Sequence, residues 1–319
     1  MVKYVINRLL LMLLIIVITF VICFVLIRLL PLPEISSSLT TAQQEAIRAR
    51  REALGYGKPI PEQLIIYLRS IFVRGSWGVS EYMYPSTDVL QVFYEKLPAT
   101  MIVNLWSIIF SIPIGIAFGV WAALKKNTWI DHTISTLVMV VISVPSFVYA
   151  FMIQYFLCFK LGWFPQMLIS GTDWFSWDMF VSMVPAIMSM SFGVIAGFTR
   201  TTRAELTEVL TSEFMLLART KGLTKGQAVV RHGMRNIMVI ILPAIFGEFI
   251  AIMSGSLIIE KIFGIPGVGA LYLNSISTTD YNFFMLLTVF YIVVGLLSGL
   301  VVDVSYGFID PRIRMGSKK

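Results

Sequence analysis

Residues 199–236 read TRTTRAELTEVLTSEFMLLARTKGLTKGQAVVRHGMRN, a polar and basic stretch between two apolar runs at 179–198 and 237–259. Each run can cross a membrane, because the hydrocarbon core of a bilayer takes roughly 20 mostly apolar residues of helix. The chain offers six such runs, at 9–30, 99–124, 133–157, 179–198, 237–259 and 284–304. This pattern predicts an all-α integral membrane protein with six transmembrane helices, in which residues 199–236 join the fourth helix to the fifth.

The composition excludes a soluble globular protein. Hydrophobic residues make up 57% of the 319 and charged residues 13%, whereas about a quarter of a soluble domain is charged. The run at 9–30 follows Lys3 and Arg8 as a secretory signal would, but it is longer than the roughly 7–15 residues of a signal core, so we expect a retained helix. Because it lacks the small-residue face through which membrane helices pack, we place it at the periphery against lipid.

The net charge of +7 raises nucleic-acid binding as an alternative, and the placement of the charges argues against it. Of the 25 Lys and Arg residues, fifteen lie in the N-terminus, the loops at 125–132 and 199–236, and the C-terminus. The short loops on the other face hold two, Lys160 and Lys261. Cytoplasmic loops of membrane proteins are enriched in Lys and Arg. We therefore expect a multi-pass protein of the bacterial cytoplasmic membrane with both termini in the cytoplasm.

The expected organisation has four parts. They are an N-terminal transmembrane helix at 1–30, an extracellular helical segment at 31–95, a five-helix core at 96–306 and a cytoplasmic tail at 307–319. Within the extracellular segment, Thr40 and Gln43 stand at capping-box spacing, and Pro59 opens a second helical pattern. This segment is expected to form a small external cap and not a separate enzyme.

Small residues recur every four positions in the later spans. The series are Ser111, Gly115, Gly119; Ser189, Gly193, Gly197; Gly247, Ala251, Gly255; and Gly295, Gly299. Membrane helices associate through such faces, so four spans are predicted to bundle tightly. Prolines inside or beside the spans are expected to bend them: Pro113, Pro145, Pro185 and Pro243.

The 199–236 loop carries the signals of a helix, a tight turn and a second helix. The first helix is expected to start at Thr202-x-x-Glu205, and the second at Thr224-x-x-Gln227, both capping boxes. Gly222 is a natural C-cap between them. An apolar stripe is predicted on the first helix, from Leu206, Leu210, Phe214 and Leu217. Spacing alone leaves two alternatives open: the helix rests on lipid headgroups, or it docks a soluble partner.

Four segments along the chain combine into a family signature. They are 213–223 (EFMLLARTKGL) with Arg231-His232 and Arg235-Asn236; Arg74-Gly75-Ser76-Trp77-Gly78 with Leu97-Pro98-Ala99-Thr100; Glu260-x-x-Phe263-x-x-Pro266-Gly267-x-Gly269 followed by Asp280-Tyr281; and Asp303-x-x-Tyr306-x-x-x-Asp310-Pro311-Arg312-Ile313-Arg314. Across essentially its whole length the chain resembles the type I ABC importer permeases of the oligopeptide and dipeptide family, in particular the first, B-type, of their two permease subunits. The Glu-Ala-Ala triplet found in the loop of other permeases is absent.

The resemblance implies that the loop holds a coupling helix seated in a cleft of an ATPase subunit. The residues expected to carry this contact are Glu213, Phe214, Leu217, Ala218, Arg219, Lys221, Gly222 and Leu223. The chain has no phosphate-cradling G-x-x-x-x-G-K-[ST] motif. It is therefore expected to be no enzyme and to carry no cofactor, with ATP and Mg bound on two partner ATPase subunits. A second homologous permease subunit and an extracellular peptide-binding protein are the other implied partners.

Glu248 is the acidic residue well inside a span, where charge is costly and usually faces a cavity or a partner. We hypothesise that it lines the peptide path, together with Met253, Ser254 and Ser256 on the same helix. The alternative is a buried hydrogen bond to a neighbouring helix.

The apolar segment at 262–273 is interrupted by glycine and proline, and such backbone at membrane depth must be buried in protein or line a cavity. It is interpreted as an external gate, with ordinary packing as the alternative. The gate residues are Glu260, Phe263, Pro266, Gly267 and Gly269.

Two functional classes follow. The first is a permease subunit of an ABC importer, with oligopeptides as the expected cargo and dipeptides, nickel complexes or glutathione as alternatives. The second is an ion-coupled secondary transporter. Such carriers usually show several carboxylates within their spans and internal repeats, so a single acid at Glu248 and no evident repeat disfavour it.

Overall fold

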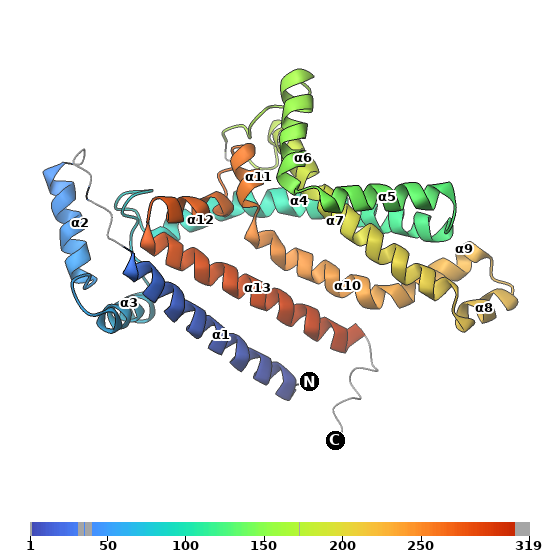
Figure 1. Cartoon of the computed structure of the whole chain (residues 1–319), viewed down its shortest axis with the longest axis horizontal. Coiled ribbons are helices and arrows are strands. Elements are labelled where there is room, and N and C mark those ends of the chain that lie inside the picture. Colours follow the sequence, from blue (N-terminus) through green and yellow to red (C-terminus); the bar gives the residue numbers. More distant parts are fainter. Residues whose placement is uncertain (1, 31–34, 36–39, 172, 310–319) are drawn as a thin grey trace. The chain divides into compact units, whose positions relative to one another are not determined.

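The computed structural model describes residues 2–30, 35, 40–171 and 173–309, and this part of the chain is helical apart from its turns and one isolated bridge between Val79 and Asp88 (Figure 1). The α-helices are α1 Val2–Leu29, α2 Thr41–Ala53, α3 Ile60–Arg74, α4 Val89–Leu124, α5 Trp129–Ser143, α6 Ser146–Ile153, α7 Trp177–Leu210, α8 Glu213–Thr220, α9 Lys225–Ala228, α10 Met234–Ala251, α11 Leu257–Ile262, α12 Val268–Ser277 and α13 Tyr281–Ile309. Two π-helical turns, Gln154–Lys160 and Val229–Gly233, and a 3₁₀ turn, Ile252–Ser254, join some of them. The predicted all-α membrane fold is confirmed.

Among the described residues, five helices are long and apolar enough to cross a membrane: α1, α4, α7, the helix running from α9 through α10, and α13. The third predicted span is not one straight helix. It is the pair α5 and α6, bent by 98° at Val144 and Pro145 (Figure 1). Pro145 lacks a backbone N–H and disfavours helical backbone at the residue before it, and Val144 is accordingly extended, with φ −96° and ψ 127°.

The described chain divides into two compact units. Unit 1 contains residues 99–266 and 297–309, and unit 2 contains residues 2–98 and 267–296. The long helices α4 and α13 each contribute residues to both units.

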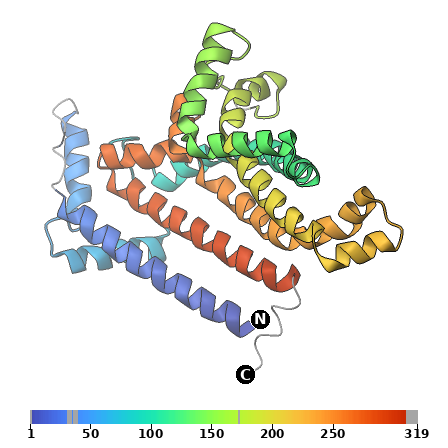
Figure 2. The same cartoon turned by 45° about the vertical axis from the view of Figure 1, so that its right-hand side comes forward.

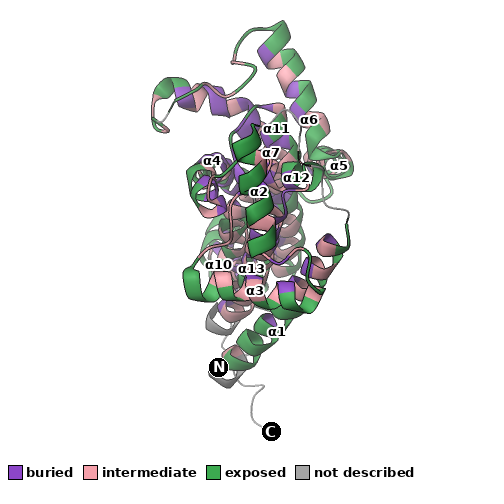
Figure 3. Cartoon of the chain, turned by 90° about the vertical axis from the view of Figure 1, so that its left-hand side faces the viewer, coloured by how far each residue is buried: buried purple, intermediate pink, exposed green. Residues whose placement is uncertain are grey.

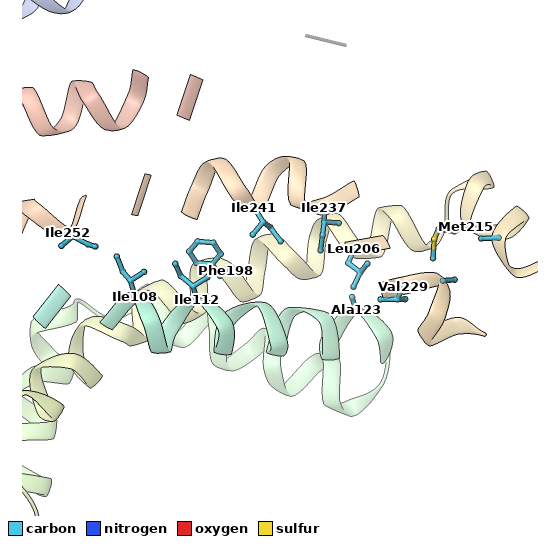
Figure 4. Packing of buried hydrophobic residues seen from close by; sticks show 12 residues of the cluster. Ile108, Ile112, Ala123, Phe198, Leu206, Met215, Val229, Ile237, Ile241 and Ile252 are labelled. Atoms are coloured by element: carbon cyan, nitrogen blue, oxygen red, sulfur yellow. The ribbon is translucent and has the colours of Figure 1, made fainter. Parts of the chain in front are cut away.

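Unit 1 is organised around α4, α5, α7 and α10. Its largest apolar cluster runs along α4, α7 and α10 and continues into α8 and the turn after α9 (Figure 4). The cluster is built from Ile108, Ile112, Ala123, Phe198, Leu206, Met215, Ala218, Ala228, Val229, Ile237, Ile241 and Ile252. The residues that carry α8 are therefore part of the same core as the membrane helices.

The predicted small-residue packing is confirmed between α4 and α7. A Cβ added at Gly119 would lie 2.5 Å from the Cβ of Thr202, and one added at Gly115 would lie 2.9 Å from the carbonyl oxygen of Ile195. Within the described part of the chain this packing is not found at Gly193 and Gly197, or at Gly295 and Gly299 in α13, where an added Cβ meets nothing within 4 Å. These glycines leave open space instead of bringing two helices together.

Two helix boundaries differ from the sequence expectation. No helix starts at Thr202, because α7 continues unbroken to Leu210 and Thr202 is fully buried inside it. The fifth span ends as an α-helix at Ala251. Beyond the 3₁₀ turn, Gly255 has a φ of +64°, a left-handed conformation that interrupts the helix before α11.

Unit 2 contains α1, α2 and α3, and the predicted cap of α2 is confirmed. The Thr40 hydroxyl accepts from Gln43 N and the Gln43 side chain accepts from Thr40 N, which closes the capping box. The rings of Phe24 in α1 and Tyr67 in α3 stack 5.5 Å apart. The residues of α1 turned away from this contact are exposed from Ile6 to Leu29 (Figure 3), as expected for a helix at the periphery.

Buried and half-buried polar groups connect α1 and α2 to the turns of unit 2. The Arg28 guanidinium lies 3.9 Å above the ring of Tyr56, a cation–π contact. Glu81 pairs with Arg51 at 3.2 Å; burial raises the pKa of the Glu81 carboxyl, and the neighbouring guanidinium opposes the rise. Burial likewise raises the pKa of the Tyr56 hydroxyl above its usual range.

Candidate functional site

The helix α8 has one buried face and one exposed apolar face. Met215 and Ala218 are buried in the unit 1 cluster with Leu206 (Figure 4). On the other side Phe214 is 43% exposed and Leu217 55% exposed. The predicted continuous stripe is therefore wrong, because Leu206 points into the core while Phe214 and Leu217 point away from it.

The turn after α8 is compact, as predicted. Lys221 closes the helix and Gly222 follows with a φ of +92°, a conformation that glycine adopts without strain. The next helix, α9, begins with the predicted capping box, in which Thr224 and Gln227 bond to each other's backbone N–H groups. Together α8 and α9 form a helix–turn–helix at the end of α7 (Figures 1 and 2).

Two polar contacts fasten this end of unit 1. The Lys225 ammonium donates to the carbonyl oxygen of Leu124, the last residue of α4, at 3.1 Å. Arg203 of α7 holds the buried Asp131 of α5 with two bonds, Nε to Oδ1 at 2.5 Å and Nη2 to Oδ2 at 2.9 Å. Asn127 N, in the α4–α5 turn, donates to the same carboxylate. The sequence analysis did not predict these contacts. For Asp131 the available signal was an acidic residue close to the expected start of a helix.

The predicted coupling residues thus have unequal exposure. Ala218 is buried and Leu223 half-buried, so both belong to the support of the segment. The exposed members are Glu213, Phe214, Leu217, Arg219, Lys221 and Gly222. An exposed apolar patch carried on a helix whose inner face is packed is a surface suited to burying against another protein.

A cavity of about 400 Å³ lies between α7 and α10, and Glu248 lines it. The other lining residues are Met190, Gly193, Val194, Gly197, Phe198, Thr201, Ile241 and Ala244. Glu248 makes no side-chain hydrogen bond with the described residues, so the alternative of a buried bond to a neighbouring helix is not found there. A carboxylate on a largely apolar wall presents a negative charge to whatever occupies the cavity.

The cavity has room because two positions of α7 that face it are glycines. Gly193 and Gly197 face it one turn apart, and a side chain at either position would extend into the open space. Sequence spacing identified these two residues but assigned them to helix packing. The other predicted path residues lie elsewhere: Met253 and Ser256 are half-buried beyond the end of α10 and do not line the cavity, and the side chain of Ser254 lies outside the described part.

The predicted gate segment is held by buried polar contacts. Glu260 is 2% exposed and accepts from the Thr100 hydroxyl of α4 at 2.8 Å. Gly255 is required beside it, because an added Cβ would lie 2.4 Å from the Glu260 Oε1. Phe263 is buried, and its carbonyl oxygen accepts from Leu168 N at 2.8 Å.

The remaining gate residues follow Phe263 along the chain. Pro266, where the first segment of unit 1 ends, is exposed, whereas Gly267 and Gly269 are buried within unit 2, at the start of α12. The structure thus gives Glu260 and Phe263 defined partners in unit 1.

Comparisons with known proteins agree with this architecture. Residues 115–315 match the model of the binding-protein-dependent transport system inner membrane component, and residues 1–104 match its N-terminal membrane component. The chain is 34% identical to the "Dipeptide transport system permease protein DppB" of Lactococcus lactis subsp. cremoris, over 99% of this chain and 100% of the relative. It is 28% identical to the "Oligopeptide transport system permease protein OppB" of Haemophilus influenzae, over 98% and 100% respectively.

A third relative and one solved structure extend the comparison. The "Glutathione transport system permease protein GsiC" of Salmonella choleraesuis is 30% identical over 98% of this chain and 99% of its own length. Among solved structures, the inward-facing MetNI methionine ABC transporter matches with a TM-score of 0.53 and 17% identity, covering 69% of this chain and 95% of that one. This last likeness concerns the fold alone.

Proposed function

The chain belongs to the binding-protein-dependent transport system inner membrane components, as a permease subunit of a peptide ABC importer, and from that premise we propose that it forms half of a peptide path which ATPase subunits drive through α8. The second half of the path comes from a homologous permease subunit, and two ATPase subunits bind the ATP and Mg. An extracellular binding protein delivers the peptide. In this arrangement both termini and the α8–α9 segment lie in the cytoplasm, and residues 31–95 lie outside the cell.

The observation that carries the proposal is the two-faced construction of α8. Its inner residues, Met215 and Ala218, are part of the membrane core, and its outer residues, Phe214 and Leu217, offer apolar surface to a partner. A push on the outer face can therefore reach α4, α7 and α10 through the side chains of this shared apolar cluster. This supports docking on an ATPase over resting on lipid headgroups.

The proposed path runs through the cavity of unit 1. A peptide carries an ammonium group at its N-terminus, and Glu248 offers the complementary charge on an otherwise largely apolar wall. The glycines of α7 give the peptide backbone room. We propose that Glu260, Phe263 and the turn up to Gly269 form the external gate, with Thr100 holding Glu260 in the closed arrangement.

Peptides are the cargo class shared by the relatives, whose names specify dipeptides, oligopeptides and glutathione. Oligopeptides remain our prediction from the sequence, with dipeptides, nickel complexes and glutathione as the alternatives. The amine-facing role of Glu248 favours cargo with a free N-terminus.

The first experiment tests coupling. A tagged chain is purified from its own cells in mild detergent, and co-purified ATPase subunits are measured by mass spectrometry. Phe214→Gln/Leu217→Gln is expected to lose the ATPase subunits, because it removes the exposed apolar face without touching Met215 or Ala218. Trp129→Gln, which removes an apolar side chain that is 75% exposed at the start of α5, is the matched control and should retain them.

The second experiment tests transport in proteoliposomes containing the purified complex and the binding protein. Uptake of a peptide should require ATP, and uptake driven by an ion gradient alone would contradict the proposal. Glu248→Gln is expected to weaken transport of free-amine peptides by about tenfold, because the neutral amide oxygen accepts a weaker hydrogen bond from the ammonium group than the carboxylate does. It should leave N-acetylated peptides unaffected. Glu208→Gln, an exposed carboxylate of α7 outside the cavity, is the control.

A further inference from the structure

A second, smaller cavity of about 230 Å³ lies at the base of the α8–α9 segment, on its inner side. It is lined by Ala123, Leu124, Lys126, Thr207, Leu210, Thr211, Met215, Arg219 and Lys225. These residues come from the end of α4, the turn after it, the last turn of α7, and both α8 and α9. A group bound here would lie between α8 and the ends of α4 and α7.

Three positive charges meet at this cavity without a carboxylate among the lining residues. Lys126 follows α4, Arg219 lies in the last turn of α8, and Lys225 opens α9. Lys225 donates to the carbonyl oxygen of Leu124. The side chains of Lys126 and Arg219 make no hydrogen bond or ion pair within the described part of the chain. Like charges so arranged repel one another, and an anion between them would relieve the repulsion.

One hydroxyl group adds a neutral donor to the same wall. The Thr207 Oγ1 is buried and has no hydrogen-bond partner among the described residues. A buried hydroxyl without a partner is costly, so such groups usually have one. The neighbouring Thr211 hydroxyl donates to the carbonyl oxygen of Glu208 at 2.8 Å. Cations and an unpaired hydroxyl form a set of donors suited to a ligand with several acceptor oxygens.

The cavity lies on the side of α8 opposite the exposed apolar residues of the proposed ATPase-docking surface. Arg219 stands four residues after Met215, so the two share a face of α8, and Met215 is 1% exposed. Phe214 and Leu217 lie on the other side. The volume accommodates a phosphate group and is too small for a folded segment of another protein.

We propose that this cavity is a binding site for a phosphate-class anion, held by Lys126, Arg219 and Lys225 with Thr207 as an additional donor. The anion bridges the end of α4, the end of α7 and the α8–α9 turn, and so stiffens the attachment of α8. A free phosphate compound and the headgroup of an anionic lipid present the same chemistry. The site is independent of the proposed transport function, because its test reads binding and not uptake.

The experiment measures hydrogen exchange of residues 211–228 in the full-length chain, reconstituted in nanodiscs under three matched conditions. The first has neutral phosphatidylcholine and chloride, the second adds inorganic phosphate at equal ionic strength, and the third replaces part of the lipid by phosphatidylglycerol. At a phosphate concentration about ten times its dissociation constant, linkage predicts exchange slowed by about 11-fold. Slowing in the second condition alone identifies a free anion as the ligand, and slowing in the third alone identifies a lipid headgroup.

Charge-removing variants locate the effect. Lys126→Gln and Arg219→Gln are exposed substitutions that should fold normally, and each is expected to abolish most of the slowing. Lys221→Gln removes an equally exposed cation two residues from Arg219 that does not line the cavity, and should retain it. Thr207→Val should weaken it. The proposal is overturned if neither phosphate nor phosphatidylglycerol slows exchange, or if Lys221→Gln abolishes the slowing as completely as Arg219→Gln does.

Discussion

Replacing Arg203 by methionine tests how unit 1 holds the end that carries α8. The substitution keeps an unbranched side chain and removes the guanidinium that binds Asp131 with two bonds of 2.5 Å and 2.9 Å. The Asp131 carboxylate is 1% exposed and would keep only the Asn127 N–H and the Ser135 hydroxyl as donors. A buried negative charge would then stand without a cation.

The expected cost follows from the burial of the two partners. Breaking a buried ion pair by removing one partner costs about 3–5 kcal/mol, because the other charge stays buried and uncompensated. Arg203 is 34% exposed, so solvent screens part of the pair and the lower end applies, about 3 kcal/mol. That change lowers the folding equilibrium constant by roughly a hundredfold.

The double variant Asp131→Asn/Arg203→Met separates charge from packing. Asparagine keeps an oxygen that accepts from the Asn127 N–H and leaves no charge behind, so most of the lost stability should return. The assay is unfolding by SDS titration in mixed micelles, read as a free-energy difference for each variant. Lys58→Met, which breaks an exposed pair with Glu62 at 3.7 Å, is the control and should change stability by less than about 0.5 kcal/mol. If Arg203→Met is neutral, or if the double variant is no more stable than the single one, the ion pair does not hold α5 to α7.

Three further predictions concern backbone and burial. Gly222→Ala should cost about 1–2 kcal/mol of local stability, because φ is +92° there. It should lower peptide-stimulated ATPase activity of the complex while membrane insertion stays normal. Gly226→Ala, where an added Cβ meets open space, should behave as wild type in the same assay. Gly119→Ala should lower stability in SDS titration by about 1–3 kcal/mol through overpacking against α7, and Gly193→Ala, which faces the cavity, should not. Burial raises the folded pKa of Glu81 above its unfolded value. The contribution of Glu81 to stability is therefore fully present below the usual glutamate pKa of about 4.3 and is lost as pH rises through the raised value. Hydrogen exchange of residues 41–88 should quicken with rising pH by more than the intrinsic exchange rate does, and this excess should be smaller in Glu81→Gln than in wild type.

The sequence predicted those features that depend on neighbouring residues. The apolar runs marked the spans, and the Thr224–Gln227 capping box and the left-handed Gly222 were readable because each acts within one turn of backbone. The buried pair of Asp131 and Arg203 was not readable, because 72 residues separate its members and nothing local marks either as the partner of the other.

The α7 glycines show a different limit. A four-residue spacing places Gly193 and Gly197 on one face of a helix, but the spacing is the same whether that face meets another helix or an open cavity. Whether that face meets a helix or a cavity depends on the facing helix α10, whose Ile241, Ala244 and Glu248 line the opening. The cavity is therefore a property of two helices that the pattern of one cannot reveal.

Gly255 links the end of the fifth span to the proposed gate. It completes a four-residue series with Gly247, which packs against α13, yet its own φ of +64° breaks the helix and brings its backbone against the Glu260 carboxylate. Glycine serves close helix packing at one position and left-handed backbone at the other, and only the second use forbids alanine on both conformational and steric grounds. The buried Glu260–Thr100 bond depends on that bare backbone, so the end of the fifth span and the proposed gate are set by the same residue.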